Sequence, residues 1–580
     1  MRELALLFRR FLRHKWTLLA GFACIPLASL GDVWITRLIG QSLDRLRTGS
    51  DTEFLVGLFW MLLGVSLLRG TFRFLQRWWL VCVSRWVEVR LKQDLFDKLV
   101  SLPTSFHVRN RSGDLVSRLT SDVENVRMFL GPGLMYVAGA LVMVPASLGY
   151  LLVLDWTVAL WMVVPLLCMG AGMWWMSARL EKHSLAVQET LAEIGHRAQE
   201  SFAGTRVVKG YSREEQQAAR FEQSSRRNLQ HQIELARARG ITHAITYTSK
   251  DLTLLPILLV GGLAMIDRSL PAGDLFMFVD LTAKVFWPII ALGWMAGVYP
   301  RSVVSARRIL ELLDTPREID EPLAPVELPN VQGHVELRGA TFTYPGSAAP
   351  TVVGIDLVVP ANGVLGVVGP TGSGKSTLLN LLARIFDAQG EVLLDGVDVK
   401  RLPLSTLRGA LGYVPQDSFL FSDTWRNNVA FGAERELDDA EIDDLARRSC
   451  MTGELERFPK GRDQKIGERG VTLSGGQRQR TCIARALARD PRVLVLDDSL
   501  SAVDTETESQ LVHNLKSASH GRTVILAAHR LSTVRHANQI VVLEEGRIVQ
   551  RGTHAELLAL PGWYADTWKR QQAQQELAGL

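Results

Sequence analysis

Two long runs without a charged residue, Phe129 to Leu154 and Trp156 to Ala178, most limit what this chain can fold into. A helix needs about 20 apolar residues to cross the hydrocarbon core of a bilayer, and each run is long enough. Only Asp155 separates the two runs. The sequence therefore predicts a membrane protein with a tight helical hairpin at this aspartate.

Weaker candidate spans have charge-free stretches but also hold ionisable residues: Trp16 to Gly40, Phe54 to Val81, Ile241 to Ile266 and Leu275 to Tyr299. Buried helices of a soluble domain give similar signals, but the two clear runs favour membrane helices here too. The sequence thus predicts six spans. The basic N-terminus resembles a signal peptide, yet no small-residue cleavage site precedes Asp32, so we expect a retained first span.

Lys and Arg cluster in the long segments before the first span and after the second, fourth and sixth, whereas the short connections carry little positive charge. The positive-inside rule places these basic segments, and both chain termini, in the cytoplasm. Two such segments, Ser84 to Arg127 and Arg179 to Gly240, are too long for turns and rich in helix formers. We expect helical extensions there, with bends at Pro103 to Leu115 and around Gly210 to Ser212.

A linker follows the last span, because Asp314 to Asn330 holds four prolines and five acidic residues and lacks apolar periodicity. Beyond it, short Val, Leu and Ile runs alternate with helical stretches, as in a soluble α/β domain. The net charge of +5 is modest for 580 residues and gives no reason to expect nucleic acid as a partner. The five cysteines are scattered and form no CxxC pair, which argues against a disulfide framework or a zinc site.

The strongest motif is GPTGSGKS, Gly369 to Ser376, which matches the phosphate-binding pattern G-x-x-x-x-G-K-[ST]. An apolar strand (Val364 to Gly369) precedes it and a helical stretch (Ser376 to Phe386) follows, which is the context that the motif requires. Without this context a glycine-rich turn with no ligand would be the simpler reading. The expected ATP-binding residues of this loop are Gly369, Pro370, Thr371, Gly372, Ser373, Gly374, Lys375, Ser376 and Thr377.

In such loops the lysine reaches the β- and γ-phosphates and the hydroxyl that follows it binds Mg²⁺, which assigns these roles to Lys375 and Ser376. A second Mg²⁺ ligand is expected from RVLVLDD (Arg492 to Asp498), an apolar strand that ends in two aspartates. Asp497 is the natural partner of Ser376. Alone, such a pair could simply cap a strand end, but the phosphate loop favours the metal site.

The segment LSGGQ, Leu473 to Gln477, resembles the signature motif of ABC ATPases, and six spans before one such domain resemble the layout of bacterial ABC half-exporters. The resemblance covers the whole chain. It implies an all-α six-helix transmembrane domain (1–313), a linker (314–330) and an α/β P-loop nucleotide-binding domain (331–580). It also implies a multi-pass protein of the bacterial inner membrane that uses ATP and Mg²⁺.

The resemblance assigns further roles. Tyr344 matches the aromatic residue that stacks on adenine, Gln416 the Q-loop glutamine near Mg²⁺, and His529 the switch histidine. Ser501 to Asp504 resembles the D-loop, and Gly467 to Gly470 the exporter loop that touches the coupling bends. A hydroxyl and exposed backbone N–H groups at a helix start form an anion site. In the family this signature site caps the γ-phosphate held by a second half-transporter, and here it comprises Ser474, Gly475, Gly476 and Gln477.

Asp498 departs from the family pattern, in which a glutamate follows the magnesium aspartate and polarises the attacking water. The shorter side chain draws the carboxylate back by more than an ångström, and misplacement of this order can cost ~100-fold in rate. The catalytic set is then Asp498, His529 and Gln416, with weakened hydrolysis. This resembles the degenerate-site subunit of heterodimeric multidrug exporters. A homodimer in which Asp498 suffices remains the alternative.

The expected activity is ATP-driven export of an amphipathic drug, lipid or peptide. Glu200 to Glu215 resembles the segment before the second coupling bend of multidrug and lipid exporters. The alternatives are a homodimeric lipid flippase or a regulatory subunit that binds ATP without efficient turnover. Ionisable residues inside the predicted spans either line a polar cargo cavity or pair between helices. They are Asp32, Arg37, Lys250, Asp251, Asp280 and Lys284.

Overall fold

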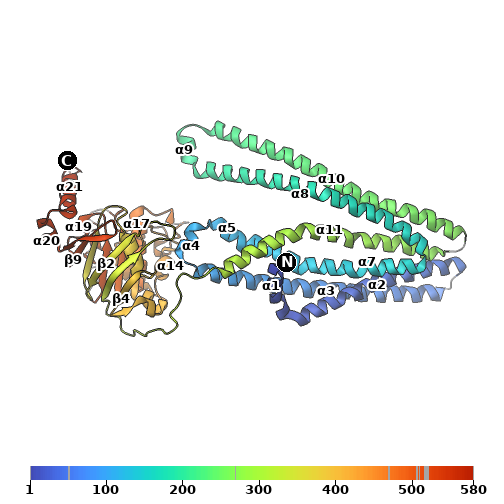
Figure 1. The fold of residues 1–580 in the computed structure, drawn as a ribbon, viewed down its shortest axis with the longest axis horizontal. Helices are drawn as coiled ribbons and strands as arrows, with labels where there is room; N and C mark the ends of the chain where they lie inside the picture. Colours follow the sequence, from blue (N-terminus) through green and yellow to red (C-terminus); the bar gives the residue numbers. More distant parts are fainter. Residues whose placement is uncertain are drawn as a thin grey trace. The chain divides into compact units, whose positions relative to one another are not determined.

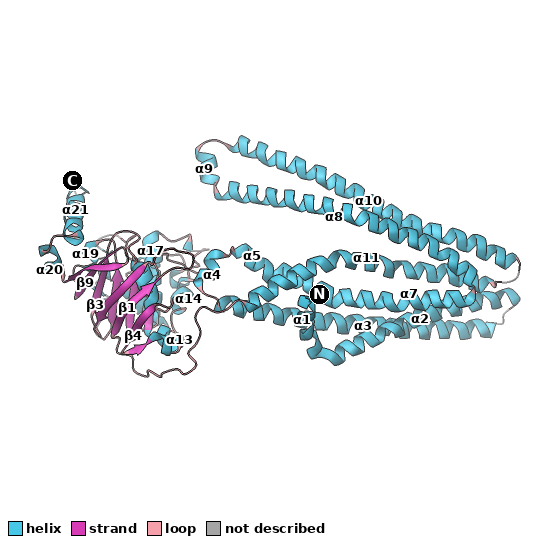
Figure 2. Ribbon diagram, in the orientation of Figure 1, coloured by secondary structure: helices cyan, strands magenta, loops and turns pink. Residues whose placement is uncertain are grey.

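The computed structural model of the chain describes residues 2–49, 52–267, 270–467, 470–503, 507–508, 510–511, 513–514 and 521–578. The chain forms two compact units, coloured along the sequence in Figure 1. One unit comprises Met1–Ser101 and Asn110–Thr315, and the other comprises Leu102–Arg109 and Pro316–Leu580. Among the described residues the first unit is helical and the second holds every strand (Figure 2).

Six helical runs of the described residues are long and apolar enough to cross a membrane, which confirms the six predicted spans. Their main helices are α2 (Lys15–Thr48), α3 (Thr52–Ser101), α7 (Leu134–Leu154), α8 (Trp156–Ala203), α10 (Glu214–Ile266) and α11 (Ala272–Asp314). The third run starts earlier, through α5 (Ser112–Ser117), the π-helical turns η2 (Arg118–Asp122) and η3 (Phe129–Gly133), and α6 (Val123–Met128) between them.

The hairpin predicted at Asp155 is present. Asp155 adopts an extended backbone (φ −156°) between α7 and α8 and caps α8, because its Oδ1 accepts the backbone N–H groups of Thr157 at 2.8 Å and Val158 at 3.2 Å. A capping aspartate satisfies amides that the first helical turn leaves without partners. One polar residue is therefore sufficient to end one span and begin the next.

Short helices occupy the predicted bends: α4 (Thr104–Arg109) in the first, and α9 (Thr205–Gly210) just before the turn at Tyr211 and Ser212 in the second. In Figure 1, α9 lies at the tip of the hairpin formed by α8 and α10. At the N-terminus α1 (Arg2–Phe11) buries Leu4, Leu7 and Phe11, and η1 (Leu12–His14) joins it to α2.

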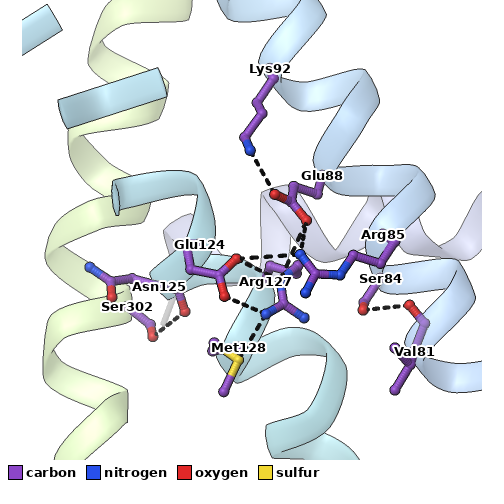
Figure 3. A network of polar contacts seen from close by, with 10 residues as sticks. All are labelled: Val81, Ser84, Arg85, Glu88, Lys92, Glu124, Asn125, Arg127, Met128 and Ser302. Carbon is purple, nitrogen blue, oxygen red and sulfur yellow. Dashed lines mark hydrogen bonds and ion pairs between the residues drawn. The ribbon is translucent and has the colours of Figure 1, made fainter. Parts of the chain in front are cut away.

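A network of charges, in which Glu88 and Arg127 are buried, joins α3 to α6 (Figure 3). The carboxylate of Glu88, with 8% of its side chain exposed, pairs with Arg85 at 2.8 Å, Lys92 at 2.7 Å and Arg127 at 3.5 Å. Arg127 also donates from Nε to Glu124 at 2.8 Å. Glu88 is thus the acceptor on which three cations from two helices converge.

Two glycines bring α2 and α11 into close contact. The backbone N–H of Gly273 donates to Asp44 Oδ1 at 2.7 Å, and a Cβ on Gly273 would overlap the carbonyl oxygen of Gly40.

We expect Gly273→Ala to destabilise the membrane unit by about 1–3 kcal/mol, because helix backbones cannot move aside as a side chain can. Thermal unfolding of the detergent-purified protein measures this. Gly262→Ala is the matched control, since a Cβ there meets open space, and equal melting points would contradict the prediction.

The second unit contains a six-stranded sheet in the order β10 (Arg547–Gly552), β9 (Gln539–Glu544), β3 (Val364–Val368), β8 (Thr523–Ala527), β7 (Val493–Asp497) and β6 (Leu411–Val414). Its strands pair in parallel except β10 with β9. A four-stranded antiparallel sheet has the order β2 (Val352–Val359), β1 (Val335–Phe342), β4 (Gln389–Leu394) and β5 (Val397–Asp398). These sheets confirm the predicted α/β domain.

Besides α4, the described helices of this unit are α12 (Lys375–Leu382), α13 (Leu404–Ala410), α14 (Trp425–Ala430), α15 (Asp439–Arg448), α16 (Thr452–Arg457), α17 (Gly475–Ala488), α19 (Leu531–Val534), α20 (His554–Ala559) and α21 (Trp563–Ala578), with 3-10 turns η4 (Val399–Arg401) and η5 (Gly461–Asp463). Residues of α14, α15 and α17 pack in the core on one face of the large sheet, and residues of α12, α13 and the antiparallel sheet pack in the core on the other. Alternate residues of β7 belong to separate cores, Leu494 and Leu496 to one and Val493 and Val495 to the other. Burial on both faces explains why this strand is continuously apolar.

One predicted boundary is wrong. The helix expected to reach Phe386 ends at Leu382, because Arg384 adopts a left-handed backbone (φ 47°) that stops the helix. The Nε of Arg384 donates to Asp387 at 2.9 Å, which holds the turn in place. The sequence carries no glycine at this turn, so the usual signal for a helix end is missing.

Candidate nucleotide-binding site

Parallel pairing brings the ends of four strands to one edge of the large sheet. The phosphate loop follows β3, Gln416 follows β6, Asp497 ends β7, and His529 follows β8. The register pairs Asp497 with Ala527 and Val414 with Leu496, so these ends lie level with one another. Ligands of α/β folds bind at the carboxyl ends of such strands. The fold therefore gathers predicted residues that are far apart in the chain.

The phosphate loop lies between β3 and α12, as the motif requires. Its glycines adopt positive φ angles of 150° at Gly369, 82° at Gly372 and 100° at Gly374. At Gly369 a Cβ would also overlap the carbonyl oxygen of Leu543, so no other residue fits that close approach. Pro370 and Thr371 lie at the exposed part of the loop.

Buried polar groups at the centre of this loop suit a phosphate anion. Lys375 is buried, its Nζ donates to the carbonyl oxygens of Gly369 and Pro370 at 2.9 Å each, and burial lowers the pKa of this lysine. The hydroxyl of Ser373 is buried without a hydrogen-bond partner among the described atoms. A loop with an unpaired donor, an ammonium and the N-terminus of α12 fits a triphosphate.

The two predicted metal ligands lie side by side. The hydroxyl of Ser376 donates to Asp497 Oδ1 at 3.0 Å. Neighbouring oxygens of an octahedral Mg²⁺ site with 2.0–2.1 Å bonds are separated by roughly 2.9 Å, so the pair is spaced to bind this ion. Burial raises the pKa of Asp497, while the Ser376 hydrogen bond and the charge of Lys375 oppose the rise. A nearby cation would stabilise the carboxylate form.

Asp498 and His529 are neighbours. Asp498 adopts a left-handed backbone (φ 42°), and its Oδ1 accepts the backbone N–H of His529 at 3.4 Å. The carbonyl oxygen of His529 in turn accepts Gln571 Nε2 at 2.9 Å. Gln416 is exposed just beyond β6, so the structure brings it to the same edge of the sheet but shows no side-chain contact with the metal pair.

The signature segment begins α17. Ser474 caps the helix, since its hydroxyl accepts the N–H of Gln477 at 3.3 Å and the Gln477 side chain accepts the N–H of Ser474 at 2.9 Å. Gly475 and Gly476 pack against Ala502, and a Cβ on Gly476 would overlap the Ala502 carbonyl oxygen. Two other loops were predicted from the sequence. Asp504 of the predicted D-loop, and Glu468 and Arg469 of the predicted exporter loop, lie outside the described residues.

Some residues of this region were not identified from the sequence. Gln479 is buried, accepts the N–H of Ala502 at 3.0 Å and donates to Ser501 Oγ at 3.2 Å, so it joins α17 to the loop after Asp498. Tyr413 donates to Asn380 at 2.8 Å, and burial raises its pKa. Tyr413 interrupts an apolar strand, which was a sequence signal for it, whereas Gln479 stands between Arg478 and Arg480 and had none. Tyr344, which was predicted, lies with its hydroxyl 3.1 Å from Thr377 Oγ1 and its ring against Phe342.

Comparisons with known proteins assign both units. Residues 18–289 match the family described as ABC transporter transmembrane region, and residues 352–501 match the family described as ABC transporter. A solved structure titled "Structure of a bacterial Atm1-family ABC exporter with ATP bound" is 26% identical and aligns with a TM-score of 0.77, covering 98% of this chain and 99% of that chain.

Two relatives match nearly end to end. The ATP-dependent lipid A-core flippase of Methylococcus capsulatus is 32% identical over 97% of this chain and 94% of the relative. The multidrug resistance-like ATP-binding protein MdlA of Escherichia coli is 32% identical over 98% of this chain and 96% of the relative. The chain therefore belongs to the ABC transporter family, as a bacterial exporter half-transporter in which six long transmembrane helices precede one ATPase domain.

Proposed function

We propose that this chain pairs with a second, different half-transporter and exports an amphipathic drug, lipid or peptide, with its own ATP site the slower of the two. The relatives named as a lipid A-core flippase and a multidrug resistance-like protein support such substrates. The pattern of basic segments supports a location in the bacterial inner membrane and a topology with both termini in the cytoplasm. Asp498 is the observation that carries the asymmetry.

The residues around the nucleotide have separate proposed roles. Gly369 to Thr377 bind the phosphates, with Lys375 as the main cation, and Tyr344 stacks on adenine. Ser376, Asp497 and Gln416 hold Mg²⁺, which neutralises charge on the phosphates when bound. His529 and Gln416 position the reacting groups around the water that Asp498 polarises. The contact of Ser376 with Asp497 and the buried Lys375 support these assignments.

The signature segment acts on the partner's nucleotide. Ser474, Gly475, Gly476 and Gln477 are proposed to form an anion site, which their position at the start of α17 supports. Each nucleotide is then clamped between two chains, and loss of phosphate after hydrolysis removes the attraction. In this proposal residues 1–313 form the transmembrane domain, 314–330 the linker and 331–580 the ATPase domain, and α4 and α9 are the coupling helices.

The length of one side chain limits hydrolysis at this site. Aspartate is one methylene shorter than the glutamate usual in the family, and the Asp498 carboxylate also accepts the backbone N–H of His529. A carboxylate held back by more than an ångström orients water poorly. The site therefore binds ATP well and turns it over slowly.

In a co-expressed pair whose partner's catalytic glutamate is replaced by glutamine, we expect Asp498→Glu to raise the ATPase rate by about 10- to 100-fold, because it returns the carboxylate to the water. Asp498→Asn should change the slow rate little. Asp490→Glu, at another left-handed aspartate (φ 52°), is the control for added length alone. If the purified chain already hydrolyses ATP rapidly and Asp498→Asn abolishes this, the impaired-site proposal is wrong.

Two alternatives make different predictions in the same assay. A homodimeric lipid flippase, favoured by the lipid A-core relatives, would be fully active as the chain alone. A regulatory subunit, favoured by Asp498, would bind ATP yet contribute no turnover even in a co-expressed pair. A heterodimeric exporter is active only as the pair, and its rate depends on the partner's glutamate.

A further inference from the structure

The membrane unit encloses a cavity of about 400 Å³ between α2, α3, α7 and α11. Part of its wall is apolar and includes Met135, Met143 and Trp287. The rest is polar, and the groups that matter here are Asp32, Arg73, Gln76, Tyr136 and Lys284. Ionisable side chains at bilayer depth are costly, so they pair with one another or face a polar space. Both occur here.

Asp32 lines this cavity, Asp280 lies next to it against the cavity residue Lys284, and both carboxylates are already paired. Asp32 is buried, and its two oxygens accept Arg69 at 2.8 Å and Arg73 at 3.0 Å. Asp280 pairs with Lys284 at 2.6 Å, as their spacing of four residues on one helix predicts. Lys284 also donates to Thr36 Oγ1 at 2.6 Å. Three cations face two carboxylates in this cluster, which leaves one positive charge in excess.

Arg73 is the cation with donors to spare. It donates one N–H group to Asp32, its other N–H groups have no partner among the described residues, and 61% of its side chain is exposed. Gln76 lies one turn further along α3 on the same wall, and Tyr136 comes from α7. A guanidinium with free N–H groups matches the paired oxygens of a phosphate or a carboxylate.

We propose that this cavity binds an amphipathic anion, with its phosphate or carboxylate headgroup on Arg73 and its apolar part along the methionine and Trp287 wall. The inference rests on the proposed export function and narrows its substrate class. An amphipathic cation would meet an excess of like charge. Lys250 and Asp251 do not change this balance, because both are exposed on α10 and neither lines the cavity.

The test adds charge without breaking an ion pair. Gln76→Glu places a carboxylate on the cavity wall, and Gln76→Lys places a cation there. Binding of radiolabelled dodecyl phosphate and dodecyltrimethylammonium is measured on the full-length chain in phosphatidylcholine nanodiscs, with empty nanodiscs as background. Arg77→Gln is the matched control, since Arg77 is an exposed residue of the same helix outside the cavity wall.

We expect the unmodified chain to prefer the anion, Gln76→Glu to weaken dodecyl phosphate binding at least tenfold, Gln76→Lys to strengthen it, and Arg77→Gln to leave it unchanged. Equal affinity for anion and cation in all variants overturns the proposal. Inorganic phosphate distinguishes the source of the headgroup: if it displaces dodecyl phosphate at similar concentration, the site binds a free anion and the amphipathic assignment is wrong.

The assay omits ATP, so it separates the two proposals. If the chain does not bind the anion but a co-expressed pair still couples ATP hydrolysis to transport, only the proposed substrate class is wrong. If the chain binds the anion but supports ATP hydrolysis in no assembly, the proposed export function is wrong instead.

Discussion

Lys375→Met is expected to weaken ATP binding by about 2–5 kcal/mol, the usual cost of removing one partner from a buried charge pair. This corresponds to roughly 30- to several-thousand-fold in affinity. The loss is large because Lys375 is the buried cation at the centre of the loop, and its ammonium already holds the carbonyl oxygens of Gly369 and Pro370. Equilibrium binding of a fluorescent ATP analogue to the purified chain measures it.

Lys400→Met is the matched control. Lys400 also donates from Nζ to a backbone carbonyl, that of Ala388 at 2.6 Å, but it lies outside the phosphate loop. The control should keep ATP affinity within a factor of two or so, and both variants should melt at similar temperatures. Unchanged binding in Lys375→Met would remove the phosphate loop from the ATP site.

Glu88→Leu should destabilise the membrane unit by about 1–3 kcal/mol, the usual cost of removing one partner from buried polar groups. The substitution removes the carboxylate on which Arg85, Lys92 and Arg127 converge (Figure 3). Arg127 is 5% exposed and keeps Glu124 as a partner, so the cost arises because Arg85 and Arg127 are left to share that one carboxylate. Thermal unfolding of the detergent-purified protein, monitored by size-exclusion chromatography, gives the shift in melting temperature.

Glu222→Leu is the comparison. Glu222 pairs with Arg226 at 2.6 Å on α10, but 60% of its side chain is exposed, and exposed pairs contribute about 0–1 kcal/mol. Its variant should melt close to the unmodified protein. Similar shifts for the two variants would mean that the Glu88 network contributes no more than a surface pair.

The parts of the fold predicted from sequence are those set by local chemistry. A charge-free run long enough to span a bilayer can form few other structures, so the hairpin at Asp155 could be predicted directly. The phosphate loop was equally clear, because its glycines, Lys375 and Ser376 are consecutive. Asp497 needed only one further step, since an apolar strand that ends in a carboxylate beside such a loop has an evident role.

What the sequence did not reveal depends on contacts between distant segments. Nothing near Glu88 indicates that Arg127 will lie against it, because the two belong to different helices. Gln479 was missed since its partners, Ser501 and Ala502, are brought close only by the fold. The pairing of Asp32 with Arg69 and Arg73 likewise requires two helices to be placed side by side.

The cap on α17 has a consequence for the proposed binding of the partner's nucleotide by the signature segment. The Ser474 oxygen accepts the Gln477 amide, which leaves its own hydroxyl hydrogen to donate to another oxygen. The Gln477 side chain is occupied by the same cap and stays out of the way. In the proposed dimer, this segment therefore already has the capped form in which it would bind the partner's nucleotide.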